Sequence, residues 1–113
     1  MANRLHPLVS TGRLHSLAMS RSLVERRLTV VAEQLKRLRR ELAVADEQLT
    51  HFTEEADDAR LRSLVSETPL AQQELREAQK HADAMRRHQV EVQGKIAQLE
   101  QTQDDLLDRL LES

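Results

Sequence analysis

The amino-acid sequence predicts an all-α protein, an antiparallel two-helix coiled-coil hairpin with a short N-terminal arm. Three observations support this fold class: a composition poor in aromatic and turn-forming residues, two long heptad seams, and a short segment between the seams that can end one helix and begin another.

The composition argues against sheet-based folds. The 113 residues include one aromatic side chain (Phe52), no Cys, two Gly and two Pro, and 32% of them are charged. A sandwich, barrel or doubly wound sheet normally needs aromatic side chains in its core and Gly and Pro in its turns. A protein built from long helices remains.

The charge pattern also bears on location. No run approaches the roughly 18 apolar residues that a membrane-spanning helix needs. Arg4 and Arg13 are not followed by the apolar core of a secretory signal. We therefore expect no membrane insertion and a cytoplasmic location.

The first seam repeats with the 3.5-residue period of a coiled coil. Its steps of three and four residues skip no position, and only Arg21 is polar. The seam consists of Leu14, Leu17, Arg21, Val24, Leu28, Val31, Leu35, Leu38, Leu42, Ala45, Leu49, Phe52, Ala56 and Ala59. With Leu28 at heptad position a, the pattern predicts a first long helix over residues 14–65. Residues 1–13, which contain His6-Pro7 and Thr11-Gly12, lack a sustained helical phase and are expected to form the arm.

The second seam is equally regular and predicts a second long helix over residues 69–112, within one coiled-coil domain. It consists of Ala71, Leu75, Ala78, Ala82, Met85, Gln89, Val92, Ile96, Leu99, Gln103, Leu106 and Leu110. Between the seams the phase breaks, because the first register would place Ser63 and Ser66 on the seam and leave Leu61, Leu64 and Val65 outside it.

The predicted turn, residues 66–68, contains the signals that separate two helices. Thr68 is a favourable N-cap, and Pro69 fits the first helical position, where a missing N–H is tolerated. Helices joined by so short a turn lie antiparallel. If the numbers of facing residues add up to 134, apolar residues face each other in layer after layer, as in Leu38 with Ile96, and the turn centres on Glu67.

Three polar residues lie on the predicted seam and are interpreted as register-setting. Gln89 should face Ala45, and Gln103 should face Val31. A polar group at such a position lowers stability but restricts the pairing. Arg21 lies near the open end, opposite Ser113, where its aliphatic stem can be buried while its guanidinium reaches water.

Other residues beside the seam suggest further contacts. The apolar residues Leu23, Val30, Val44, Leu107 and Leu111 either broaden the contact within the hairpin or bind another chain. Because two helices bury little apolar surface, we expect association with a protein partner or a further copy. Charges in the same register favour the antiparallel pairing: Asp104, Asp105 and Asp108 should lie near Arg26 and Arg27, and Arg86 and Arg87 near Asp46 and Glu47.

Two charged groups are the candidate partner-binding residues. The acidic group, Glu54, Glu55, Asp57 and Asp58, lies close to the predicted turn, and the basic group comprises Lys36, Arg37, Arg39 and Arg40. A basic stripe can follow phosphates, but the chain has no Tyr or Trp on which bases could stack. Nucleic acid is therefore not an expected partner.

The sequence offers no catalytic or metal-binding pattern. No P-loop, GxGxxG, GxSxG or HExxH motif occurs. His81 and His88 share a helix face but lie about 10 Å apart along the axis, too far for one metal ion. Paired carboxylates would need a desolvated cleft to act as acid and base. We therefore expect no enzyme activity, no metal and no cofactor.

These features predict a non-enzymatic interaction module, a scaffold, adaptor or regulatory strut that docks on a larger protein assembly. One alternative is a transcription or nucleotide-signalling regulator that clasps a transcription factor or inserts its acidic tip into RNA polymerase. In another, the architecture and the opening Leu5-Leu8-Leu14-Leu17 pattern resemble the coiled-coil stalks of flagellar and type III export ATPases. That resemblance implies a hexameric ATPase as partner and assigns no residue a role.

Overall fold

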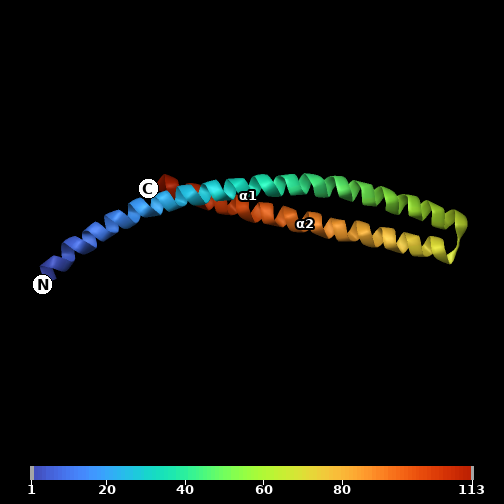
Figure 1. The fold of residues 1–113 in the computed structure, drawn as a ribbon, viewed down its shortest axis with the longest axis horizontal. Helices are drawn as coiled ribbons and strands as arrows, with labels where there is room; N and C mark the ends of the chain where they lie inside the picture. The colour runs from blue at the N-terminus through green and yellow to red at the C-terminus, as the bar shows by residue number, and fades with distance from the viewer. Residues whose placement is uncertain (1, 113) are drawn as a thin grey trace. The chain divides into compact units, whose positions relative to one another are not determined.

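The computed structural model describes the backbone of residues 2–112 and the side chains of residues 21–112. This part of the chain forms two helices, α1 (Ala2–Ser66) and α2 (Pro69–Glu112), and contains no strand. After the turn at Glu67 and Thr68, α2 runs back beside α1 (Figure 1). The predicted fold class, an all-α helical hairpin, is confirmed.

The start of α1 differs from the expected boundary. The sequence predicted an arm over residues 1–13 and a helix from Leu14, whereas α1 begins at Ala2. Pro7 lacks a backbone donor, and Gly12 lowers helix propensity by about 1 kcal/mol relative to Ala, so the local signal is weak. A helix that is already nucleated gains one hydrogen bond for each residue it adds, which favours continuation through such positions. The side chains of His6, His15 and the first seam residues, Leu14 and Leu17, lie outside the described part.

The helices form two compact units, each described here by itself. One unit combines α1 up to Leu35 with α2 from Leu99 onwards, and the other comprises Lys36–Gln98. Within the second unit we distinguish a middle section, residues 36–52 and 85–98, from a tip section, residues 53–84, which contains the turn.

In the unit of residues 21–35 and 99–112, the predicted seam residues are buried or half-buried apart from Arg21. Val24, Val31, Leu35 and Leu106 are buried, and Leu28, Leu99, Gln103 and Leu110 are half-buried. Arg21 is exposed and pairs with Glu25 on its own helix, Nε to Oε1 at 3.7 Å; Ser113, which it was expected to face, lies outside the described residues.

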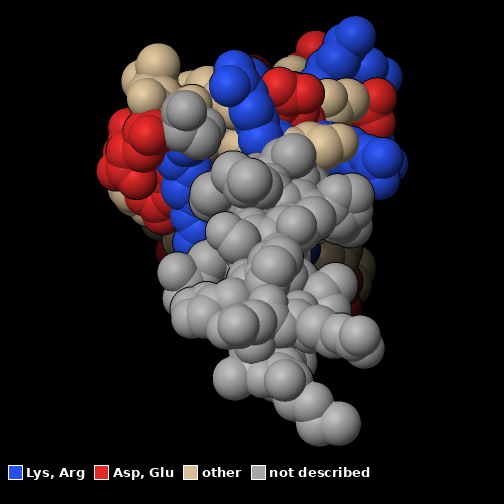
Figure 2. All heavy atoms as spheres, turned by 90° about the vertical axis from the view of Figure 1, so that its left-hand side faces the viewer, with Lys and Arg blue, Asp and Glu red and all other residues tan. Residues whose placement is uncertain are grey.

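The surface of this unit carries both signs of charge. Basic and acidic side chains lie next to one another at the end shown in Figure 2. No ion pair among the described residues joins Arg26 or Arg27 to Asp104, Asp105 or Asp108, so the proximity predicted from the register does not become direct pairing. An exposed ion pair contributes only about 0 to 1 kcal/mol to stability, which is too little to fix two long side chains in one arrangement.

The Lys36–Gln98 unit shows the predicted antiparallel register. Three contacts cross between the helices: Gln89 Nε2 donates to Asp46 Oδ1 at 2.7 Å, His88 Nε2 lies 3.5 Å from Glu41 Oε1, and Arg62 Nε lies 4.0 Å from Glu74 Oε2. The residue numbers of each pair add up to between 129 and 136, close to the expected 134. All seam positions of this unit, from Leu38 to Ile96, are buried or half-buried.

The register also defines which positions face outwards. Heptad positions are counted from Leu28 at a on α1 and from Leu75 at a on α2. Each of the ion pairs Arg62–Glu74 and Glu41–His88 then joins a g position of α1 to a g position of α2. Positions e and g therefore flank the seam, and positions b, c and f point away from the other helix. We call the b, c and f positions of residues 36–65 the outer face of α1.

Each helix is capped at the turn. Glu67 adopts a left-handed conformation, with φ of 48°, and its N–H donates to the Ser63 carbonyl at 3.1 Å. This is the αL type of helix C-terminus. Thr68 caps α2 as predicted: the Ala71 N–H donates to Thr68 Oγ1 at 3.1 Å, and the Gln72 N–H donates to the Thr68 carbonyl at 3.1 Å.

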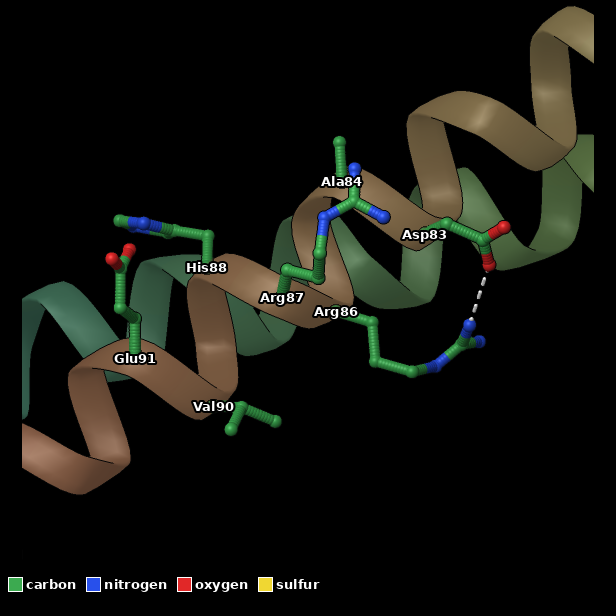
Figure 3. Close-up of a pocket in the computed structure, with 7 residues that line it drawn as sticks. All are labelled: Asp83, Ala84, Arg86, Arg87, His88, Val90 and Glu91. Carbon is green, nitrogen blue, oxygen red and sulfur yellow. Dashed lines mark hydrogen bonds and ion pairs between the residues drawn. The ribbon is translucent and has the colours of Figure 1, made fainter.

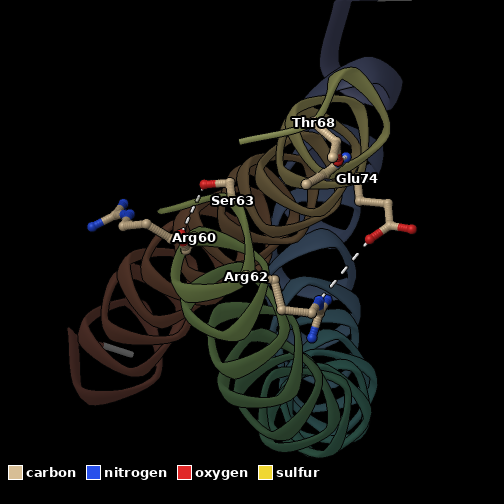
Figure 4. Close-up of polar contacts among 6 residues, drawn as sticks. Arg60, Arg62, Ser63, Thr68 and Glu74 are labelled. Carbon is tan, nitrogen blue, oxygen red and sulfur yellow. Dashed lines mark hydrogen bonds and ion pairs between the residues drawn. The ribbon is translucent and has the colours of Figure 1, made fainter. Parts of the chain in front are cut away.

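The predicted phase break lies closer to the turn than expected, because Ser63 keeps the first register whereas Ser66, its next seam position, is exposed. The first register continues through Ala59 to Ser63, which is 4% exposed, while Leu61 and Leu64 stay outside. The hydroxyl of Ser63 donates to the Arg60 carbonyl at 2.8 Å (Figure 4), so a polar residue is tolerated on the seam. Its small side chain also leaves room for α2.

Among the described residues, neither helix contains a stretch that is both long and apolar enough to cross a membrane.

Candidate protein-interaction surfaces

The most distinctive surface is a group of large aliphatic side chains around the turn. We define the tip apolar surface as Leu61, Leu64, Val65 and Leu70, which are 62%, 68%, 87% and 65% exposed. Leu61, Leu64 and Val65 are spaced i, i+3, i+4, so they share one side of α1. A contiguous group of such residues marks a contact surface more often than scattered single ones do.

The seam of the tip section explains why these side chains are outside. Most of its members are small: Ala56, Ala59, Ser63, Ala71, Ala78 and Ala82, with Leu75 the exception. Small residues let two helix backbones approach closely, and no large side chain is needed to fill the space between them. Leu61, Leu64 and Val65 occupy outward positions f, b and c, where α2 cannot cover them.

Polar contacts hold the helices together beside the tip apolar surface. Arg62 and Glu74, which are 60% and 48% exposed at their side chains, form the ion pair between the two helices (Figure 4). Neither this pair nor the Thr68 cap uses the aliphatic side chains. The tip apolar surface is therefore not needed for the contacts that close the turn.

The predicted acidic group is divided between two sides of α1. Glu54, Asp57 and Asp58 lie on the outer face and continue directly into Leu61 along the helix. Glu55 lies on the g flank, where its Oε1 is 3.2 Å from His51 Nε2. All four carboxylates are exposed.

The predicted basic group is divided in the same way. Lys36, Arg37 and Arg40 lie on the outer face, and Arg39 lies on the e flank; all four are exposed. None of them forms an ion pair with another described residue. The basic and acidic groups are 18 residues apart, about 27 Å along the axis, so the structure does not bring the eight candidate residues into one site.

Among the polar seam residues, Gln89 forms a hydrogen bond between the two helices. Gln89 reaches Asp46 on α1, next to the Ala45 that it was expected to face. Arg86, which was predicted near Asp46, instead pairs with Asp83 on its own helix at 2.9 Å. Gln89 therefore takes the place at Asp46 that the sequence assigned to an arginine.

The three described histidines lie on the flanks and outer face. The rings of His51 and His81 lie 5.7 and 5.8 Å from that of Phe52, and His88 faces Glu41. No three His, Asp or Glu side chains among the described residues are grouped so that they could hold a metal ion.

Two surface hollows among the described residues are open to solvent. The first is lined by Asp83, Ala84, Arg86, Arg87, His88, Val90 and Glu91. All of these belong to α2, and their side chains spread outwards from one helix (Figure 3). The second, of about 300 Å³, lies on the e flank above Ala56 and Ala82 and is bordered by Arg60 and Arg86. Both are open furrows between side chains.

Comparison with protein-family models, curated proteins and solved structures finds no match to this chain.

Sequence reasoning missed the tip apolar surface although its signal was present. Leu61, Leu64 and Val65 were recognised as leaving the seam, but they were interpreted as the sign of a phase break. Reading Ser63 and Ala59 as seam residues would have identified them as an exposed group.

Proposed function

We propose that the chain is a non-enzymatic protein-interaction module that docks on its partner through the turn end of the hairpin. The observation that carries this proposal is the exposure of Leu61, Leu64, Val65 and Leu70, by 62% to 87%, beside a seam that does not need them. Full burial of a Leu or Val side chain contributes about 1.5 to 3 kcal/mol. Four such side chains at one end of the molecule are enough to anchor an interface.

The neighbouring charges describe the partner. Glu54, Asp57 and Asp58 precede the aliphatic residues on the outer face of α1. A complementary surface has an apolar groove for the tip and basic residues along one rim, because like charges there would oppose binding. The partner is therefore a protein with an apolar groove bordered by Lys or Arg.

Docking at the turn end is also the geometry of the transcription-regulator hypothesis, in which the tip enters RNA polymerase. That hypothesis, the export-ATPase stalk, the cytoplasmic location and the absence of enzyme activity stay predictions. The identity of a captured partner separates the first two: RNA polymerase or a transcription factor in one case, a hexameric ATPase in the other.

The test compares three tagged full-length proteins in cells of the source organism. The tip variant carries Leu61→Gln, Leu64→Gln and Val65→Gln. The control carries Leu107→Gln, Leu111→Gln and Val90→Gln, which exchange the same residue types at exposed positions away from the turn. Gln has good helix propensity, so neither variant weakens its helix.

Affinity purification with mass spectrometry should recover a protein with the wild type and the control but not with the tip variant. A photo-cross-linking residue at position 65 should then attach to that protein, and one at position 90 should not. Equal recovery of every captured protein with both variants would overturn the proposal.

A further inference from the structure

A second surface of α1 has a charge pattern that is complementary to itself. Along the outer face, Lys36, Arg37 and Arg40 come first, a stretch with Val44 and a single carboxylate follows, and Glu54, Asp57 and Asp58 come after it. Glu47 lies midway between the two groups. All of these residues are exposed and belong to the Lys36–Gln98 unit, and Val44 is 53% exposed.

We propose that residues 36–58 of the outer face of α1 bind the same residues of a second copy of this chain, antiparallel, around a two-fold axis at Glu47. In this arrangement Lys36 faces Asp58 of the partner subunit. By the same rule, Arg37 faces Asp57 of the partner subunit, and Arg40 faces Glu54 of the partner subunit. Repeating the three contacts on the other side of the axis completes a closed, isologous interface.

The heptad positions support this register. A two-fold axis at an f position carries every f position onto an f position and exchanges b with c. Lys36 at b then meets Asp58 of the partner subunit at c, and Arg40 at f meets Glu54 of the partner subunit at f. Axes one heptad earlier or later do not bring all three basic residues opposite all three acidic ones. The two charged groups therefore select one register.

Neither charged group is used within the hairpin. No described residue forms an ion pair with Lys36, Arg37 or Arg40, and the same holds for Glu54, Asp57 and Asp58. The α2 segment that pairs in register with residues 36–40, residues 94–98, also contains Lys95 and no acidic residue. The charges of the basic group are thus left for another chain.

Val44 supplies the apolar part of the contact. It lies three residues from the axis and faces Thr50 of the partner subunit, while Ala43 faces His51 of the partner subunit. The apolar area is small and exposed ion pairs contribute little each, so the dimer is weak and sensitive to salt. One contact opposes it, because the two Glu47 carboxylates meet at the axis.

The dimer uses the acidic residues Glu54, Asp57 and Asp58, which also precede the tip apolar surface, but its three ion pairs end before Leu61. The tip variant, which changes only aliphatic residues, therefore keeps its test distinguishable from that of partner docking. Sedimentation velocity of the full-length protein at low ionic strength should show a concentration-dependent equilibrium between monomer and dimer that shifts to monomer as salt is added. The tip variant should behave like the wild type.

Two charge-reversed chains provide the decisive comparison. One carries K36E, R37E and R40E, and the other carries E54K, D57K and D58K. Each alone should be monomeric, and an equimolar mixture should form a 1:1 heterodimer, because an all-acidic face then meets a face on which only Glu47 is acidic. The control pair, Arg39→Glu and Glu55→Lys, changes flank residues of the same two segments and should leave the wild-type equilibrium within about twofold.

The axis itself can be probed because the chain has no cysteine. Glu47→Cys should form a disulfide between copies under mild oxidation, and Ala84→Cys, on α2, should not. Glu47→Gln should strengthen the dimer several-fold by removing the repulsion. A wild type that stays monomeric at low salt, or a mixture of the charge-reversed chains that does not associate, would overturn the proposal.

Discussion

The middle and tip sections of the Lys36–Gln98 unit use the same register with opposite results. In the middle section the seam is formed by large aliphatic residues such as Leu38 and Ile96, and only Val44 and Val90 among the large aliphatic side chains are exposed. In the tip section the seam is mostly Ala, and every large aliphatic side chain except Leu75 lies outside. The comparison teaches that the heptad position, and not local hydrophobicity, decides which residues the second helix covers.

The largest expected difference in unfolding free energy is between substitution of a seam residue in the middle section and of an outward residue in the tip section. Ile96 is 8% exposed, and Ile96→Ala should lower the free energy of unfolding by about 2 to 5 kcal/mol. Leu64 is 68% exposed, and Leu64→Ala should change it by less than about 0.5 kcal/mol. Urea unfolding followed by circular dichroism measures both, and equal losses would remove the contrast between the sections.

Enlarging a small seam residue of the tip should also destabilise the hairpin. Ala59 is 1% exposed, so Ala59→Leu overpacks the close approach of the helices and should cost about 1 to 3 kcal/mol of unfolding free energy. Ala84→Leu makes the same exchange at an exposed position of α2 and should change it by less than about 0.5 kcal/mol. A gain in stability from Ala59→Leu would show that the tip seam is not closely packed.

The cap of α2 should contribute a smaller amount. Thr68→Ala removes the acceptor of the Ala71 N–H and should lower the unfolding free energy by about 1 kcal/mol. Thr50→Ala is the matched control, because the Thr50 hydroxyl donates only to the Asp46 carbonyl of its own helix, at 3.1 Å. Faster amide exchange at Ala71 in the first variant alone would locate the effect. An equal loss in both variants would argue against a specific cap.

The smallest expected effect is a gain in the middle section. Gly94 lies within α2, and a Cβ built there meets nothing within 4 Å. Gly94→Ala should raise the unfolding free energy by up to about 1 kcal/mol, because Ala has the higher helix propensity. A loss of stability in the thermal or urea transition would show that the backbone at this position is more constrained than its open surroundings indicate.

Most of the fold could be predicted from the sequence because one physical signal dominates it. The heptad period identified the seam, and the cap at Thr68 with Pro69 placed the turn; the pairs Asp46–Gln89 and Arg62–Glu74 agree with the predicted register. The start of α1 could not be predicted from local preferences, since Pro7 and Gly12 weaken them where helix continuation wins.

The candidate surfaces were harder to predict. Charged residues were easy to count, but their division between outer face and flank, as for Arg40 and Arg39, depends on the register. The tip apolar surface was missed because Ser63 looks unlike a seam residue until its hydroxyl is seen to bond its own helix. Pairing between exposed charges also escaped prediction, as Arg86 shows, because such pairs are too weak to be fixed by sequence spacing.

The unfolding free energy of the Leu61→Gln, Leu64→Gln, Val65→Gln variant tests most directly whether these side chains are surplus to folding. If they serve a partner, the variant should unfold within about 1 kcal/mol of the wild type, because water already surrounds the three side chains in the isolated hairpin. A loss of several kcal/mol would mean that they belong to the core of the protein, and docking through the tip would have to be abandoned.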